Sequence, residues 1–106
     1  MSSHILEDLY ATIAGRKGGD PDTSYTAKLF SRGRGKIAQK VGEEACETIV
    51  AALSEGAPQV IGESADLLYH LMVLWAECGV APKDVFAELA RRQGVSGIAE
   101  KNARKG

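Results

Sequence analysis

Apolar residues recur along the chain at spacings of three and four, which is the pattern of amphipathic helices. No stretch alternates apolar and polar residues as a half-buried strand does, and no proline interrupts an apolar periodic segment. The pattern predicts a short helix over 3–15, a short helix or turn over 24–33, long helices over 36–54 and 58–78, and a further helix over 82–92. The sequence therefore predicts an all-α fold.

The two long segments should pack as antiparallel neighbours, because only the short connection EGAP joins them. The second of them, over 59–78, is apolar around most of its circumference, and such a helix must be covered on several sides. One partner helix and two short ones do not cover it. We therefore predict a homodimer, in which the helices of two copies complete a core of the four-helix-bundle type.

Size and composition narrow the class of protein. The 106 residues suit one domain, 1–106, and 44% hydrophobic with 25% charged residues is ordinary for a globular chain. The net charge of −1 gives no basic field that would direct the chain to nucleic acid. The most apolar run, ADLLYHLMVLWA, is too short for a membrane span. We expect neither nucleic acid nor membrane as a partner.

The two cysteines, Cys46 and Cys78, lie in apolar helical segments and have no metal-ligand spacing. A free cysteine in such surroundings behaves as a small hydrophobic residue, so we interpret both as reduced core residues. The first ten residues contain acids and no long apolar run, unlike a signal peptide. Both observations favour a cytoplasmic location.

Three carboxylates, Glu43, Glu44 and Glu47, occupy five positions of the first long helix, where like charges three or four residues apart repel by about 0.2–0.5 kcal/mol per pair. On a helical wheel they share roughly a quarter-turn with Lys36 and Lys40. The apolar residues of the segment are predicted on the other side: Ile37, Val41, Ala45, Ile49 and Ala52. Taken alone, this pattern is typical of a solvated acidic face in which Lys40 pairs with Glu43 or Glu44.

The second long helix changes that interpretation. Glu63, Asp66 and His70, spaced three and four apart, interrupt an almost continuous apolar surface and should be substantially enclosed. Burying an unpaired carboxylate is costly. In an antiparallel pair, Glu44 and Glu47 could face these acids, and four carboxylates at one point need a cation. A hard divalent ion such as Mg²⁺ prefers oxygen ligands and also binds phosphates. His70 is better interpreted as a satisfied residue of the core, or as one that supports the metal ligands, than as a ligand itself.

Two acidic motifs resemble a known superfamily. EEACE at 43–47 and ESAD at 63–66 have the form E-E-x-x-E followed by E-x-x-D on consecutive helices, which resembles the all-α, MazG-like nucleotide pyrophosphohydrolases. The wider text is similar to the phosphoribosyl-ATP pyrophosphatase family over nearly the whole chain. The similar segments are SYTAKLFSRGRGKIAQKVGEEACETIVAAL, ESADLLYHLMVLW and GVSGIAEKNARK.

The resemblance implies Mg²⁺-dependent hydrolysis of a small-molecule nucleotide, phosphoribosyl-ATP, to phosphoribosyl-AMP and pyrophosphate in histidine biosynthesis. It implies catalytic roles for five acids: Glu43, Glu44, Glu47, Glu63 and Asp66. All of them except Glu43 are expected to be direct metal ligands. Glu43 could bind metal, orient water or act as general base. The chain is expected to be monofunctional, without the cyclohydrolase domain to which some members of the family are fused.

The substrate is a long polyanion, so several cations should converge on it, with arginine suited to bidentate phosphate contacts. The candidate substrate-binding residues are Lys28, Arg32, Lys36, Lys40, Lys101 and Arg104. A role in surface solubility is the alternative for each of them. Tyr25 could stack on a base, although packing is the more common role for an aromatic residue beside a short helix.

Two other functions remain open on the sequence alone. One is a house-cleaning pyrophosphatase that acts on non-standard nucleotides with the same chemistry. The other is a helical dimerisation module whose metal is structural. The sequence does not fix the number of metal ions, the phosphorus that water attacks, or a contribution of the partner subunit to the site.

Overall fold

The computed structural model describes residues 2–93, which form five helices and, within that range, no strand. The helices are α1 (Ser2–Gly15), α2 (Tyr25–Arg32), α3 (Arg34–Ser54), α4 (Ala57–Cys78) and α5 (Pro82–Arg92). The predicted all-α fold is confirmed, and the segment 24–33 is a helix rather than a turn. In the described range, no helix is both long and apolar enough to cross a bilayer.

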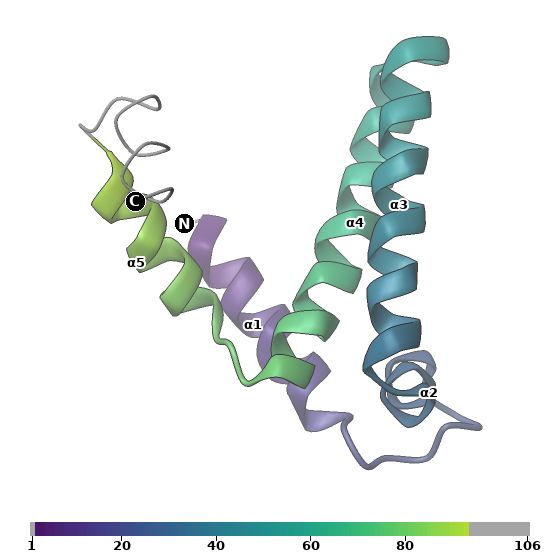
Figure 1. The fold of residues 1–106 in the computed structure, drawn as a ribbon, viewed down its shortest axis with the longest axis vertical. Coiled ribbons are helices and arrows are strands. Elements are labelled where there is room, and N and C mark those ends of the chain that lie inside the picture. The colour runs from purple at the N-terminus through teal and green to yellow at the C-terminus, as the bar shows by residue number, and fades with distance from the viewer. Residues whose placement is uncertain (1, 94–106) are drawn as a thin grey trace.

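Helices α3 and α4 lie side by side as an antiparallel pair and form the largest contact between elements (Figure 1). Helix α2 lies across the N-terminal end of α3 and contacts both long helices, whereas α1 packs against α4 and also contacts α5. Among residues 2–93, no other helix lies at the end of the pair where α3 leads into α4 (Figure 1). This arrangement leaves one half of the α3–α4 pair with exposed sides.

Local signals in the sequence set the ends of these helices. The Ser24 hydroxyl caps α2 by accepting a hydrogen bond from the Ala27 N–H at 3.1 Å. Gly33, with a φ of 92°, separates α2 from α3, and Gly79, with a φ of 75°, ends α4. Glycine adopts these positive φ values without the steric cost that a side chain would impose. The turn at Gly33 is what sets α2 across the start of α3.

The hydrophobic core lies where α1, α2 and both long helices meet. Its buried members are Ile13, Leu29, Phe30, Ile37, Met72 and Val73. Partly buried side chains from α1 and the C-terminal half of α4, among them Leu9 and Trp75, pack against this group. The core therefore fixes α2 to the N-terminal part of α3.

Helix α3 buries a stripe that shares Ile37 with the predicted one but then departs from it. Its buried residues are Ile37, Glu44 and Ala51, which recur at intervals of seven, as along a coiled-coil seam. Ile49, predicted on the apolar side, is 57% exposed. The prediction is confirmed for Ile37 and wrong for Ile49, because helix α4 lies against the Glu44 and Ala51 side of α3 and not against the side with Ile49.

The interpretation of the cysteines as core residues was also wrong, because both are exposed. Cys46 lies on a side of α3 that α4 does not cover, and Cys78 is the last residue of α4.

The core assignment predicts a large effect of Ile37→Ala, which removes a fully buried side chain. We expect the free energy of unfolding to fall by about 2–5 kcal/mol, from lost burial and the resulting cavity. Ile5→Ala is the matched control, because Ile5 is 68% exposed, and it should change the free energy by less than about 0.5 kcal/mol. Urea unfolding at one protein concentration measures both, and equal effects would contradict the assignment.

Candidate functional site

Three carboxylates from α3 and α4 meet across the antiparallel seam. Glu44, Glu63 and Asp66 each place one oxygen within 4.8 Å of the others. Glu63 and Asp66 share one face of α4 because residues three apart on a helix are neighbours. The structure thus brings together three of the four acids that were predicted as metal ligands.

Glu47, the fourth predicted ligand, is outside this compact group but lies beside Glu63. The two side chains line one hollow on the surface, together with Cys46 and Val50. Glu47 is exposed, and its negative charge helps to raise the pKa of Glu63. It therefore belongs to the same acidic neighbourhood through its contact with Glu63.

Glu63 is the most constrained of these acids. Its Oε1 atom is buried and has no hydrogen-bond partner among the described residues. Burial raises the pKa of Glu63, and the neighbouring carboxylates of Glu47, Asp66 and Glu44 raise it further. An unpartnered buried oxygen among negative charges is costly unless a positive charge compensates it.

The donor set fits a hard divalent cation, because all the converging atoms are carboxylate oxygens. The only lysine bonded to the group is Lys40, as far as residues 2–93 show, with its Nζ 3.9 Å from Glu44 Oε2 and 3.4 Å from Glu43 Oε1. The predicted pairing of Lys40 is confirmed, with both acids. Glu63 and Asp66 form no salt bridge within the described part of the chain. The cluster therefore keeps an excess of negative charge that a cation would neutralise.

The prediction that the polar residues on one face of α4 are enclosed is correct for His70 but wrong for Asp66. His70 is 6% exposed, whereas Asp66 is exposed because no described helix covers its side of α4. His70 Nδ1 lies 2.8 Å from the Asp66 carbonyl oxygen, which can only accept, so Nδ1 donates. In the neutral ring, Nε2 then accepts from the Tyr25 hydroxyl at 2.9 Å. His70 is thus a satisfied core residue.

Two tyrosines tie α2 to α4. The Tyr25 ring stacks on Tyr69 with centroids 6.3 Å apart, and the Tyr69 hydroxyl forms a hydrogen bond with Thr26. Burial raises the pKa of Tyr25, which keeps its hydroxyl protonated as the donor to His70. Tyr25 therefore has the packing role that was considered for it, and it also forms one wall of a hollow.

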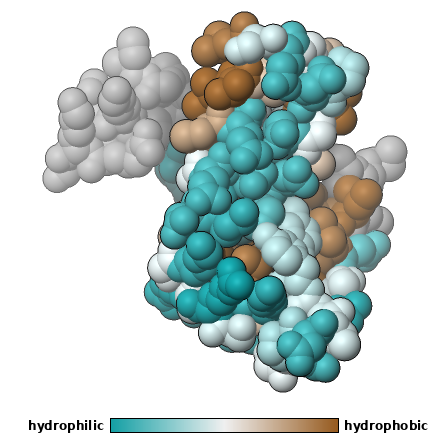
Figure 2. All heavy atoms as spheres, turned by 90° about the vertical axis from the view of Figure 1, so that its right-hand side faces the viewer, coloured by the Kyte–Doolittle hydropathy of each residue, from teal (hydrophilic) through white to brown (hydrophobic). Residues whose placement is uncertain are grey.

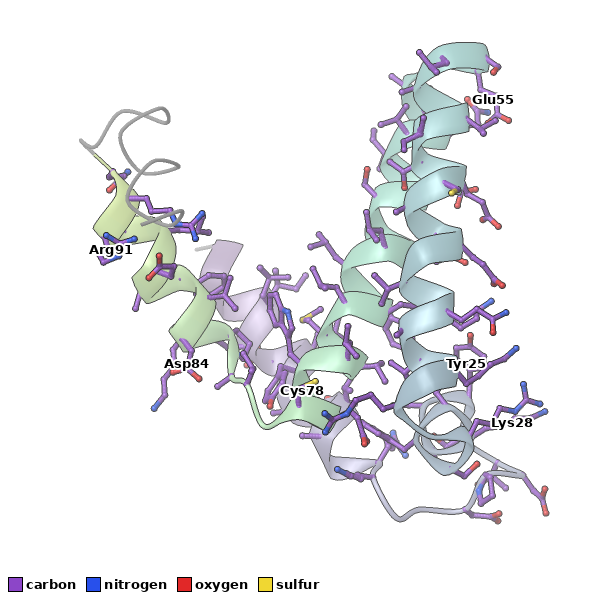
Figure 3. The ribbon with its side chains drawn as sticks, in the orientation of Figure 1. Tyr25, Lys28, Glu55, Cys78, Asp84 and Arg91 are labelled. Carbon is purple, nitrogen blue, oxygen red and sulfur yellow. The ribbon has the colours of Figure 1, made fainter. Side chains whose placement is uncertain are left out.

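That hollow has a volume of about 190 Å³ and gathers positive charge. It is lined by Tyr25, Lys28, Leu29, Arg32, Lys36, Lys40 and Glu43, and we call it the basic hollow. Figure 3 shows Tyr25 and Lys28 extending to the same side at the foot of α3. The hollow contains four of the six predicted substrate-binding residues. The other two, Lys101 and Arg104, lie outside the described residues.

Glu43 lies in the basic hollow rather than in the group of three carboxylates. It accepts a hydrogen bond from Gln39 Nε2 at 2.8 Å. This bond and the contact with Lys40 lower the pKa of Glu43. Gln39 was missed by the sequence reasoning, although its position four residues before Glu43 is the spacing at which helical side chains meet.

The fold and the site define a class of protein: an all-α domain with a carboxylate cluster suited to a divalent cation and a neighbouring hollow suited to anions. Within that class the family is known. Residues 6–93 match the family described as phosphoribosyl-ATP pyrophosphohydrolase, and this chain belongs to that family. The resemblance seen in the sequence is thereby confirmed.

Individual relatives agree over almost the full length of the chain. It is 72% identical over 104 residues to a phosphoribosyl-ATP pyrophosphatase of Paramagnetospirillum magneticum, which covers 98% of this chain and 95% of the relative. It is 68% identical over 101 residues to that of Rhodospirillum rubrum, covering 95% of this chain and 86% of the relative. It is 62% identical over 105 residues to that of Azospirillum brasilense, covering 99% of this chain and 95% of the relative.

The raised pKa of Glu63 predicts a specific pH dependence of stability. Its folded-state pKa lies above the ordinary value of 4.5, so the folded protein holds this proton more tightly than the unfolded chain. The contribution of this proton to the stability of the fold is therefore complete below pH 4.5, and it is lost as the pH rises through the folded-state pKa of Glu63. In EDTA, we expect the Tm of the unmodified protein to fall relative to that of Glu63→Gln as the pH rises above 4.5.

Scanning calorimetry between pH 4 and 8 measures this difference, and Glu7→Gln, an exposed site on α1, is the control. Parallel Tm profiles in EDTA would contradict the assignment of Glu63.

Proposed function

We propose that this chain, as a single domain, hydrolyses phosphoribosyl-ATP to phosphoribosyl-AMP and pyrophosphate in the cytoplasm, the second step of histidine biosynthesis. The observation that carries the proposal is that a carboxylate cluster and the basic hollow lie next to each other and share helix α3. The chain in which they do so is a member of the phosphoribosyl-ATP pyrophosphohydrolase family. A nucleotide with a triphosphate needs both features, because its charge must be neutralised and its phosphates held.

In this proposal the oxygens of Glu44, Glu63 and Asp66, with Glu47 beside them, hold Mg²⁺. The buried and unpartnered Oε1 of Glu63 supports this assignment. When bound, the ion would supply positive charge for the leaving pyrophosphate and a lower pKa for an attacking water. Lys40 adds a fixed positive charge between the cluster and the basic hollow, since it contacts both Glu43 and Glu44.

Glu43 has a different role from the proposed ligands. Its lowered pKa makes it a weak proton acceptor, and Gln39 and Lys40 hold it in the basic hollow. We therefore assign Glu43 to orienting a water or a hydroxyl by accepting a hydrogen bond, rather than to removing a proton. The cations Lys28, Arg32, Lys36 and Lys40, and outside the described residues Lys101 and Arg104, bind the phosphates of the substrate.

The test is release of pyrophosphate from phosphoribosyl-ATP by the purified protein with Mg²⁺. We expect release that EDTA abolishes. Glu63→Gln should lower kcat/KM by more than roughly a hundredfold, because substitution of a residue that only supports a metal ligand already lowers metal affinity or activity ten- to a hundredfold. Glu7→Gln should retain activity, and circular dichroism should show that both variants are folded. An intact substrate after incubation with the unmodified protein would refute the proposal.

A panel of simple and deoxynucleoside triphosphates separates the proposal from the house-cleaning alternative, which requires faster turnover of those nucleotides. A protein that hydrolyses no nucleotide, and in which Glu63→Gln loses stability in Mg²⁺, would instead be a helical module with a structural metal.

The proposal includes a homodimer. Large apolar residues are exposed on the part of the α3–α4 pair that no other described helix covers: Ile49, Val50, Leu53 and Ile61. Figure 2, which faces the α3 side, shows hydrophilic residues along most of this face and hydrophobic ones at the end where α3 leads into α4. Scattered apolar residues are normal on a surface, but a group of them favours an interface.

A charge placed in this group should prevent association. We expect Leu53→Lys, at a position that is 82% exposed, to shift the protein from dimer to monomer in sedimentation velocity experiments. Ile5→Lys is the matched control on α1, also at an exposed apolar position, and should leave the dimer intact. A monomeric unmodified protein, or dissociation by both variants, would contradict this interface.

A further inference from the structure

The basic hollow holds more positive charge than its surroundings neutralise. Lys28, Arg32 and Lys36 line it and form no salt bridge with any residue between 2 and 93. Lys40, at the side nearest the acidic cluster, is the lining cation with carboxylate partners. Three cations without a salt bridge, against the one carboxylate of Glu43, leave the hollow positive. This is an anion-binding arrangement, and arginine supplies a planar fork that matches phosphate.

The hollow adjoins the carboxylate cluster at Lys40, which contacts Glu44, and extends away from it toward the start of α3. Lys36 precedes Glu44 by eight residues, which corresponds to about 12 Å along a helix axis. Lys28 and Arg32 belong to α2, which lies at the N-terminal end of α3 (Figure 1). The site thus has a metal-type region at the middle of α3 and a phosphate-type region at its start.

The proposed substrate likewise has two charged ends. Phosphoribosyl-ATP carries a triphosphate on one ribose and a single phosphate on a second ribose, with the purine ring between them. We propose that the basic hollow binds the phosphate of the phosphoribosyl group, and that Lys28, Arg32 and Lys36 thereby select this substrate over plain ATP. The inference rests on the proposed function, in which Mg²⁺ held by the carboxylate cluster would supply the positive charge for the leaving pyrophosphate.

The walls of the hollow suit a sugar phosphate as well as a bare anion. Leu29 and the Tyr25 ring provide apolar surface beside the cations. The Tyr25 ring is fixed by stacking on Tyr69 and by the hydrogen bond from its hydroxyl to His70. This wall is therefore formed before any ligand arrives, which lowers the cost of binding.

The competing arrangement places the triphosphate itself in the hollow. Two probes distinguish them: ribose 5-phosphate, which resembles the phosphoribosyl end, and pyrophosphate with Mg²⁺, which resembles the other end. NMR titration of the Mg²⁺-loaded protein gives a Kd for each probe. This measurement does not depend on turnover, so failure of the proposed function would be seen separately, as absent pyrophosphate release.

We expect Arg32→Ala to raise the Kd of ribose 5-phosphate about tenfold, the loss of one charge-assisted hydrogen bond. The Kd of pyrophosphate should stay within about twofold, as for an independent site. Arg32 is exposed, so the variant should fold. Arg16→Ala, at an exposed arginine outside the hollow, is the matched control and should change neither Kd.

Three results would overturn the inference. The first is a pyrophosphate Kd that rises as much as that of ribose 5-phosphate in Arg32→Ala. The second is an equal effect of Arg16→Ala, which would indicate a general loss of charge. The third is no saturable binding of ribose 5-phosphate by the unmodified protein. With the substrates themselves, Arg32→Ala should reduce kcat/KM for phosphoribosyl-ATP about tenfold more than for ATP.

Discussion

The antiparallel contact of α3 and α4 is the constraint on which the rest of the structure depends. Ile37, Glu44 and Ala51 form one buried stripe along it, so a carboxylate occupies a position that is apolar one heptad earlier and later. Across the seam it meets Glu63 and Asp66. Burying Glu44 beside two further acids is unfavourable, and the packing of Ile37 with α1, α2 and α4 at the other end of the seam offsets that cost. The core therefore holds the acids together.

Helix α2 gives the site its second half. Gly33 turns the chain between α2 and α3, and hydrogen bonds from Tyr25 and Thr26 reach His70 and Tyr69 on α4. These contacts fix the cations of α2 relative to those of α3. A chain with a net charge of −1 thus has strong local charges of both signs, and Lys40 lies where the two regions meet.

The sequence was sufficient to predict the helices, because the spacing of apolar residues and the positions of glycines and prolines mark where the helices begin and end. It also predicted the acidic cluster, because acids three apart on α4 must share a face and antiparallel pairing brings α3 opposite. It was insufficient for the buried face of α3. A helical wheel gives angles between residues but not the direction of the partner helix, so Ile49 suggested the wrong side. The exposure of Asp66 and Cys46 could not be predicted for the same reason, because the sequence does not show which side of each helix its neighbours cover.

Glu43 and Glu44 are consecutive on α3 but face two different chemical environments. Consecutive residues on a helix differ in direction by about 100°, so Glu44 enters the seam while Glu43 enters the basic hollow. The surroundings then act in opposite directions: hydrogen bonds lower the pKa of Glu43, while burial and neighbouring acids raise that of Glu63 beside Glu44. Carboxyl groups whose pKa values diverge are suited to different tasks. The repulsion between adjacent acids on α3 is thus the consequence of one helix serving a cation site on one side and an anion site on the other.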